Sequence, residues 1–176
     1  EGVANPFAMR GHALSAALLL AAAASPASAE DLSADERAVA DAVTGFMDAI
    51  ASDDKTLLAK HMIPEAMIFV HNQTDPEMPR VDLVPVAQHL ERWGARTGNY
   101  EEVMSYDHVL VTGDMAQVWG PYSFTYNGGL THCGVNSISL VRDAEGTWKV
   151  GNTSFTMVAP DRCTEVGADW VDGDDS

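Results

Sequence analysis

The second half of the chain constrains the fold most, because apolar and polar residues alternate there from residue 101 to residue 158. Alternation with a period of two is typical of β-strands that bury one face. Short turns containing glycine divide the region into expected strands at residues 101–112, 115–126, 130–142 and 147–158. Strands joined by such short turns pair in antiparallel fashion. We therefore predict an antiparallel meander.

The lengths of the turns decide which side chains share a face, since a slip of one residue inverts a strand. We assign a two-residue loop to Gly113-Asp114 and three-residue loops to residues 127–129 and 144–146. A two-residue Asn127-Gly128 loop has a strong hairpin preference, but it breaks the match between strands, so we reject it. With these registers the predicted inner face collects Val103, Val109, Val111, Ala116, Val118, Phe124, Ile138, Leu140, Trp148 and Val150.

Polar residues on the same predicted face gather at one end of it. They are Asp107, Tyr122, His132, Asn136, Asn152 and Ser154. An apolar hollow with a few convergent polar groups is typical of a small-molecule site. The alternative is that these groups bond one another, or water, at the frayed end of a core. We favour the pocket, because a core rarely holds so many polar groups.

The first half of the chain predicts helices. Ser33 and Glu36 form a capping box ahead of apolar residues at helical spacing, so residues 34–51 should form an amphipathic helix. A short helix at residues 55–62, a strand at 66–72, a loop at 73–80 and a third helix capped by Asp82, with Val86, Leu90 and Trp93 on one face, should follow. This order predicts an α+β fold with three N-terminal helices packed on a curved antiparallel sheet.

The histidines do not suggest a metal site. His71 ends the short strand and is a candidate base or hydrogen-bond partner in the pocket, with a surface position as the alternative. His61, His89 and His108 show no metal-ligand spacing, so we expect no metal.

Cys133 and Cys163 are the only cysteines. Cys133 adjoins His132, but successive strand residues point to opposite faces, which argues against a nucleophilic pair. Cys133 therefore belongs to the predicted outer face, and Cys163 follows the last strand closely enough to fold back over it. This placement favours a disulfide over two free thiols. The outer face should also carry Trp119, Val135, Phe155 and Met157, and a face so apolar predicts a second layer or a homodimer through the sheet.

The N-terminal segment has the features of a secretory signal peptide. Met9-Arg10 is a short basic start, residues 13–24 are an apolar run, and "SPASA" ends at Ala29. The run is too short for a transmembrane helix, which needs about 20 apolar residues; a buried helix is the alternative. We expect residues 1–8 to lie upstream of the start and residues 1–29 to be removed, giving a periplasmic or secreted protein.

The remaining chain should form one domain at residues 30–160 and an acidic tail at 161–176, of which residues 165–176 should stay solvated. The formal net charge of −16 argues against nucleic acid or an anionic membrane as a partner, because both bind clustered Lys and Arg. A small-molecule ligand and a second copy of the chain are the partners that we expect, without a cofactor.

Three segments resemble the NTF2-like superfamily, nearest to its SnoaL-like or ketosteroid-isomerase-like branch: "FMDAIASDDKTLLAKHMIPEAMIFVHN" (46–72), "VLVTGDMAQVWG" (109–120) and "ISLVRDAEGTWKV" (138–150). The resemblance implies a cone-shaped α+β barrel around a pocket, commonly dimeric through the sheet. It also implies isomerase, cyclase, dehydratase or binding functions. The steroid isomerases use an oxyanion-binding tyrosine and an aspartate base, and the resemblance puts Phe46 and Val70-His71 at those positions, without either group.

Three functions remain open. The first is an exported domain that binds a small, largely apolar ligand through Phe46, Trp93, Tyr122, His132, Asn136, Asn152 and Ser154. The second is an isomerase, cyclase or dehydratase in which His71 or His132 transfers a proton and Asp107 orients it. The third is a structural dimerisation module with a filled core.

Overall fold

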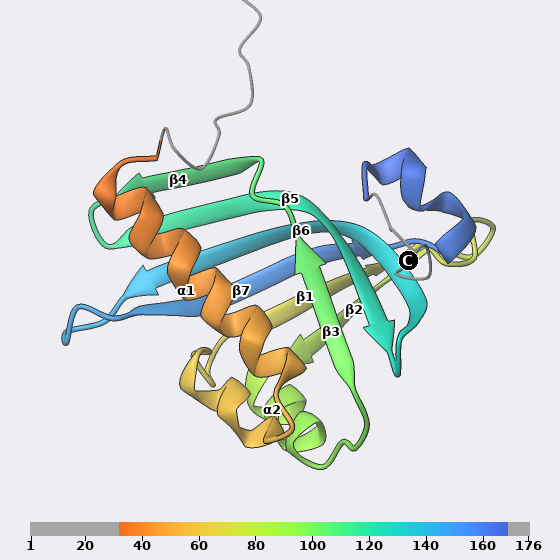
Figure 1. Ribbon diagram of the computed structural model, residues 1–176, viewed down its shortest axis with the longest axis horizontal. Helices are drawn as coiled ribbons and strands as arrows, with labels where there is room; N and C mark the ends of the chain where they lie inside the picture. The colour runs from red at the N-terminus through yellow and green to blue at the C-terminus, as the bar shows by residue number, and fades with distance from the viewer. Residues whose placement is uncertain (1–31, 169–176) are drawn as a thin grey trace, which may run out of the picture.

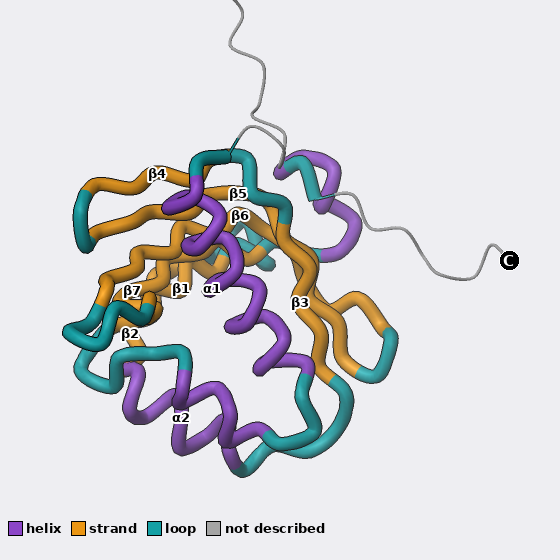
Figure 2. The backbone as a smooth tube through the Cα atoms, turned by 60° about the vertical axis from the view of Figure 1, so that its left-hand side comes forward, coloured by secondary structure: helices purple, strands orange, loops and turns teal. Residues whose placement is uncertain are grey.

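The computed structural model describes residues 32–168, so the predicted signal peptide and the last residues of the predicted tail lie outside the described residues. The strands form one curved sheet in the order β2-β1-β7-β6-β5-β3, with β4 also paired to β5. Helix α1 crosses one side of this sheet, and α2 closes the same side at one end (Figures 1 and 2). Along the chain the elements are α1 (Ala34–Ala51), η2 (Lys55–Lys60), β1 (Met67–Asn72), β2 (Arg80–Pro85), α2 (Val86–Gly94), β3 (Tyr100–Met104), β4 (His108–Thr112), β5 (Met115–Tyr126), β6 (Gly129–Arg142), β7 (Trp148–Met157) and η3 (Pro160–Val166).

Helix α1 has the predicted bounds and the predicted capping box. The Glu36 amide donates to Ser33 Oγ at 3.3 Å, and the Ser33 amide donates to Glu36 Oε2 at 2.7 Å. These bonds satisfy amides that have no partner inside the first turn of the helix. The buried stripe of α1 packs against the inner face of the sheet and consists of Val39, Ala40, Val43, Phe46, Met47, Ala49 and Ile50.

The sheet is mixed rather than purely antiparallel. Strand β1 runs parallel to β7, with Val70 opposite Phe155. The meander of β5, β6 and β7 is antiparallel as predicted, because tight turns join these strands. No tight turn joins β1 to β7, which lie far apart in the sequence, so turn patterns carried no information on their relative direction.

The segment before α2 is a strand, which corrects the predicted start of the third helix. Residues Arg80–Pro85 pair with β1 as the edge strand β2, where the last residue of the loop at 73–80 and a helix cap at Asp82 were expected. The Asp82 carboxylate instead accepts from Arg80 Nε at 3.0 Å. Helix α2 begins only after Pro85, since its first residue is Val86. The described residues thus hold two α-helices and two 3-10 helices, one of which, η3, follows the sheet.

The turn between β5 and β6 is the two-residue Asn127-Gly128 loop and not the expected three-residue loop at residues 127–129. Tyr126 pairs with Gly129, and both loop residues have positive φ, 51° and 79°. The expected pairing of Phe124 with His132 is nevertheless present, because Thr131 is an extra residue in β6. This β-bulge restores the register that a three-residue loop would have produced.

The predicted strand at residues 101–112 is broken into β3 and β4, and the break displaces their registers by one residue. Met104 pairs with Tyr122, whereas His108 pairs with Trp119. At the break, Ser105 crosses close to β5, where a Cβ on Gly120 would lie 1.8 Å from the Ser105 carbonyl oxygen. Val103 is consequently 56% exposed, and its neighbour Glu102 faces inward, which reverses the prediction for β3.

A second bulge reverses the end of β7. Leu140 pairs with Val150 as predicted, but Ile138 pairs with Thr153, so Gly151 and Asn152 together face a single residue of β6. One extra residue inverts every side chain beyond it. The predicted inner residues Asn152 and Ser154 therefore point outward, and the cavity receives Thr153, Phe155 and Met157 instead.

The predicted disulfide is confirmed. Cys133 on β6 is bonded to Cys163 on η3, with 5.6 Å between their Cα atoms. The bond lies in a small buried cluster with Val158 and Ala168, on the face of β6 opposite His132. The structured chain thus runs eight residues past residue 160, into the segment predicted as the acidic tail. None of the helices in residues 32–168 is long and apolar enough to cross a membrane.

Candidate functional site

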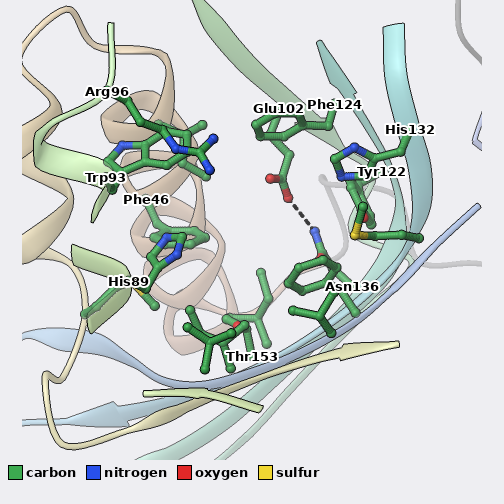
Figure 3. A pocket seen from close by; sticks show the side chains of 18 residues that line it. Phe46, His89, Trp93, Arg96, Glu102, Tyr122, Phe124, His132, Asn136 and Thr153 are labelled. Atoms are coloured by element: carbon green, nitrogen blue, oxygen red, sulfur yellow. Dashed lines mark hydrogen bonds between the residues drawn. The ribbon is translucent and has the colours of Figure 1, made fainter. Parts of the chain in front are cut away.

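A cavity of about 270 Å³ lies between the helices and the inner face of the sheet. Its walls are mostly aliphatic and aromatic, with His89 and Arg96 on the α2 side and Glu102, His132 and Asn136 across the cavity on the sheet side (Figure 3). Apolar walls with few polar groups are characteristic of small-molecule sites. The lining residues are Phe46, Ile50, Met62, Ile68, Val70, Val84, His89, Trp93, Arg96, Glu102, Tyr122, Phe124, His132, Asn136, Ile138, Thr153, Phe155 and Met157.

The most unusual group in the cavity is the carboxyl of Glu102. Asn136 Nδ2 donates to Glu102 Oε1 at 2.7 Å, and no other hydrogen bond to this carboxyl occurs in residues 32–168. Burial raises the pKa of Glu102 to about 7, against a smaller lowering by the Asn136 hydrogen bond. Desolvation disfavours a buried carboxylate, so Glu102 exists as both acid and anion near neutral pH.

The amide nitrogen of Asn136 contacts two side chains, those of Glu102 and Met104. It lies 3.6 Å from Met104 Sδ, and the Asn136 side chain is nearly buried, with 4% exposed. Because the nitrogen is engaged by Glu102 and Met104, the amide oxygen is the part of Asn136 that remains available. Glu102 and Asn136 together can offer a ligand both an acceptor and, when Glu102 is protonated, a donor.

His132 and Tyr122 form an aromatic wall beside this pair. The Tyr122 hydroxyl donates to the backbone carbonyl of Thr156 at 2.8 Å, so its proton is already engaged, and burial raises its pKa. His132 stacks on Phe124 with 5.0 Å between ring centroids. Burial lowers the pKa of His132 to about 4, so its ring is neutral at pH 7. Nδ1 of His132 lies 2.9 Å from Thr131 Oγ1.

The helical side of the cavity carries basic groups around Trp93. His89 stacks on Trp93 at 5.7 Å, and the Arg96 guanidinium lies over the same ring at 5.0 Å. Burial, then the charges of Arg96 and Arg92, lower the pKa of His89 to about 4. The histidine is therefore neutral at pH 7, and positive charge at this end of the cavity comes from arginine.

Five of the predicted ligand-contacting or catalytic residues line the cavity: Phe46, Trp93, Tyr122, His132 and Asn136. Phe46 and Trp93 come from α1 and α2, and the other three come from β5 and β6, whose faces were correctly predicted. The bulge beside His132 left these faces unchanged, because it offset the shorter loop.

Four predicted residues do not line the cavity. His71 and Ser154 lie on the other face of the sheet, where His71 Nε2 is 2.9 Å from Ser154 Oγ. Asn152 is exposed and accepts from the Met67 amide at 3.0 Å, and Asp107 is exposed at the break between β3 and β4. His71 points away from the cavity because its neighbour Val70 points into it. The bulge in β7 displaces Asn152 and Ser154, and the break between β3 and β4 displaces Asp107.

Sequence reasoning missed Glu102, His89 and Arg96. His89 could have been predicted from the sequence, because it lies one helical turn before Trp93 on the same face of α2. Glu102 could not have been predicted, since its orientation depends on the break at Ser105, which no turn motif in the sequence indicates. In the part of the chain that the structure describes, no group of three or more His, Cys, Asp or Glu side chains could hold a metal ion.

The sequence matches no protein-family model and no curated protein sequence. Solved structures nevertheless share its architecture. A proposed dehydratase of the NTF2-like family from Streptomyces avermitilis is 22% identical, with a TM-score of 0.55 over 70% of this chain and 96% of that one. An NTF2-like protein from Salmonella enterica serovar Typhimurium is 15% identical, with a TM-score of 0.54 over 70% and 91%.

A third similar structure is the β subunit of a proposed aromatic-ring-hydroxylating dioxygenase from Novosphingobium aromaticivorans. It is 12% identical, with a TM-score of 0.55 over 71% of this chain and 90% of that one. At such identities the likeness concerns the fold, which hosts several functions.

Proposed function

Because the described residues have the NTF2-like fold, we propose that they form a binding domain for a small, largely apolar molecule. The molecule occupies the cavity between α1, α2 and the sheet, and an oxygen of the ligand bonds to Glu102 or Asn136. One observation carries this proposal: within the described residues, a cavity of about 270 Å³ has mostly apolar walls and contains the Glu102 carboxyl, which accepts a hydrogen bond from Asn136 alone. An open cavity argues against the filled core of a purely structural module.

The binding proposal is tested with 2-naphthol, a neutral aromatic alcohol, by isothermal titration calorimetry. Val84 and Val81 lie on the same strand, β2, but Val84 lines the cavity and Val81 is 51% exposed outside it. Val84→Phe should fill the cavity and weaken 2-naphthol binding at least about tenfold, whereas Val81→Phe should leave it unchanged. Equal affinities of both variants and the wild type, or no binding at all, would contradict the proposal.

A second candidate function is proton transfer by Glu102. A general base works best when its pKa is near the working pH, and burial raises the pKa of Glu102 to about 7. This candidate replaces the histidines of the sequence prediction. His71 lies on the other face of the sheet, and burial lowers the pKa of His132 to about 4, which makes it a weak base at neutral pH. Phe46 lines the cavity without a donor, and Asn136 supports the base by donating to the Glu102 carboxylate.

The base is tested with 5-nitro-1,2-benzisoxazole, whose ring opens when a base removes its carbon-bound proton and the N–O bond breaks. Glu102 would accept the proton and the phenolate oxygen would leave with the bond electrons. Glu102→Gln should lower the rate by about 100-fold or more. Glu101→Gln changes the exposed neighbour on the same strand and should leave the rate unchanged. An unchanged rate in Glu102→Gln would exclude Glu102 as the base.

Export and self-association complete the proposal. The disulfide between Cys133 and Cys163 supports an oxidising compartment, consistent with the expected signal peptide. Exposed apolar side chains on β4, β5 and β6 support a homodimer through the outer sheet face. They are Leu110, Met115, Trp119 and Val141.

A further inference from the structure

We propose that the ligand is an anion, namely a largely apolar molecule with one carboxylate, and that Arg96 binds this carboxylate at the edge of the cavity. The inference rests on the proposed binding function and adds the chemical class of the ligand. It is independent of the second candidate function, because it concerns recognition by a guanidinium rather than proton transfer.

The first support is that Arg96 is positioned but unpaired. It follows α2, lines the cavity, and lies with its guanidinium carbon 5.0 Å from the Trp93 ring and 5.4 Å from the Tyr100 ring. Stacking of this kind occupies the face of a guanidinium and leaves its N–H edges free. Within residues 32–168 no carboxylate lies at ion-pair distance from Arg96, whereas Arg80, Arg142 and Arg162 all have such partners.

The second support is a local excess of positive charge in an acidic chain. Lys55 is buried beside the same aromatic pair, 5.1 Å from the Tyr100 ring, and its Nζ donates to the Ile50 carbonyl oxygen at 3.0 Å. No ion pair to Lys55 occurs in the described residues either. Arg92 is close enough to lower the pKa of His89 together with Arg96. The chain has ten Lys and Arg against 26 Asp and Glu, so three cations beside one end of a cavity, of which Arg96 lines it, favour an anion there.

Glu102 does not serve as the counter-ion of Arg96. Burial and the Asn136 hydrogen bond account for the pKa of Glu102, without a contribution from a nearby arginine. Among the polar groups of the cavity, the guanidinium of Arg96 and the Glu102–Asn136 pair are therefore separate recognition groups (Figure 3). A ligand with a carboxylate at one end and a hydroxyl or carbonyl oxygen at the other matches both.

The chemistry favours a carboxylate over a phosphate. A guanidinium binds the two oxygens of a carboxylate through parallel N–H bonds, and one arginine is enough to do so. A phosphate dianion needs more donors than this cavity provides, since its other lining groups are mainly Phe, Ile, Val and Met side chains. An aromatic or alicyclic ring therefore matches the cavity walls, and a single carboxylate matches Arg96.

The test compares 2-naphthoate with its neutral amide, 2-naphthamide, by calorimetry at about pH 6, where an aromatic carboxylic acid is ionised and Glu102 is mostly protonated. The wild type should bind naphthoate about tenfold more tightly than naphthamide. Arg96→Gln should lose this preference while keeping its affinity for naphthamide. Arg80→Gln changes an exposed arginine on β2 that does not line the cavity and should keep the preference.

Other results would contradict either the inference about Arg96 or the binding proposal, and the two cases can be told apart. Equal binding of the two probes by the wild type, or an unchanged preference in Arg96→Gln, would overturn the inference and leave the binding proposal standing. Absence of binding by both probes and by 2-naphthol would contradict the binding proposal itself. If Arg96→Gln loses both probes, Arg96→Lys decides, because a lysine that restores the naphthoate preference supports charge recognition and one that does not overturns it.

Discussion

Asn136 Nδ2 donates a hydrogen bond of 2.7 Å to Glu102 Oε1, and this bond joins two strands that are not neighbours in the sheet. Asn136 lies on β6 and Glu102 on β3, with β5 between them. The bond therefore spans the inside of the curved sheet, where the cavity lies. The Glu102 carboxyl thus lies in an apolar environment, where one hydrogen bond offsets only part of the cost of removing a carboxylate from water. Ionisation of Glu102 therefore destabilises the folded protein.

The protein should become less stable as the pH rises from about 4.5 to about 7 through the ionisation of Glu102. The pKa of Glu102 is about 7 in the folded chain against 4.5 for the ordinary group, so the folded state holds the proton more tightly in this window. The unfolding free energy therefore falls with rising pH, by up to about 3 kcal/mol, and is level above the window. Urea unfolding at several pH values measures this slope.

Glu102→Gln should remove that part of the slope and exceed the wild type in stability above pH 7, since an amide cannot ionise. Glu101→Gln is the matched control, because Glu101 is exposed and its pH profile should follow the wild type. A wild-type slope that persists unchanged in Glu102→Gln would show that other groups cause it.

Loss of the disulfide should destabilise the domain. Cys133 and Cys163 are 30 residues apart, and closing a loop of this length in the unfolded chain contributes about 3–4 kcal/mol. Cys133→Ala/Cys163→Ala should therefore unfold at lower urea than the wild type. A reductant should lower the wild-type midpoint and leave that of the double variant unchanged. Equal midpoints for reduced and oxidised wild type would contradict the prediction.

Gly134→Ala should be strongly destabilising. A Cβ at Gly134 would lie 1.9 Å from the Thr156 carbonyl oxygen, which also accepts from the Tyr122 hydroxyl. The strands would have to separate, at a cost of about 3 kcal/mol or more. Gly129→Ala on the same strand is the control, because its Cβ would meet its nearest neighbour at 3.6 Å. Thermal denaturation of both variants measures the difference, and equal losses would be inconsistent with this contact.

Trp119→Glu should convert a dimer into monomers. Trp119 is 47% exposed on the outer face, which also carries the more exposed Leu110 and Met115. A charge on this patch would be buried at a dimer interface, so the dissociation constant should rise about 100-fold or more. Sedimentation velocity measures the effect, with Met78→Glu in the loop before β2 as the control. A monomeric wild type would refute the prediction.

The prediction of the inner sheet face succeeded where two local errors cancelled. The loop at Asn127-Gly128 is one residue shorter than predicted, and the extra Thr131 in β6 makes up the difference. His132 and Asn136 therefore face the cavity as expected. Nothing compensates the bulge at Gly151 and Asn152 or the break at Ser105, so predictions failed at Asn152, Ser154 and Asp107.

The sequence alone determined the features that depend on neighbours in the chain. These features are the capping box and apolar stripe of α1, the turn at Gly113-Asp114, the alternation of β5 and β6, and the opposite orientation of His132 and Cys133. Tertiary structure decided that Glu102 enters the cavity, that the end of β7 is inverted, and that Arg96 lies against Trp93 and Tyr100. The physical reason is that the position of a bulge depends on how two strands pack against each other and against the covering helices. One extra residue in a strand turns every later side chain to the opposite face of the sheet, while the alternation of apolar and polar residues in the sequence stays the same.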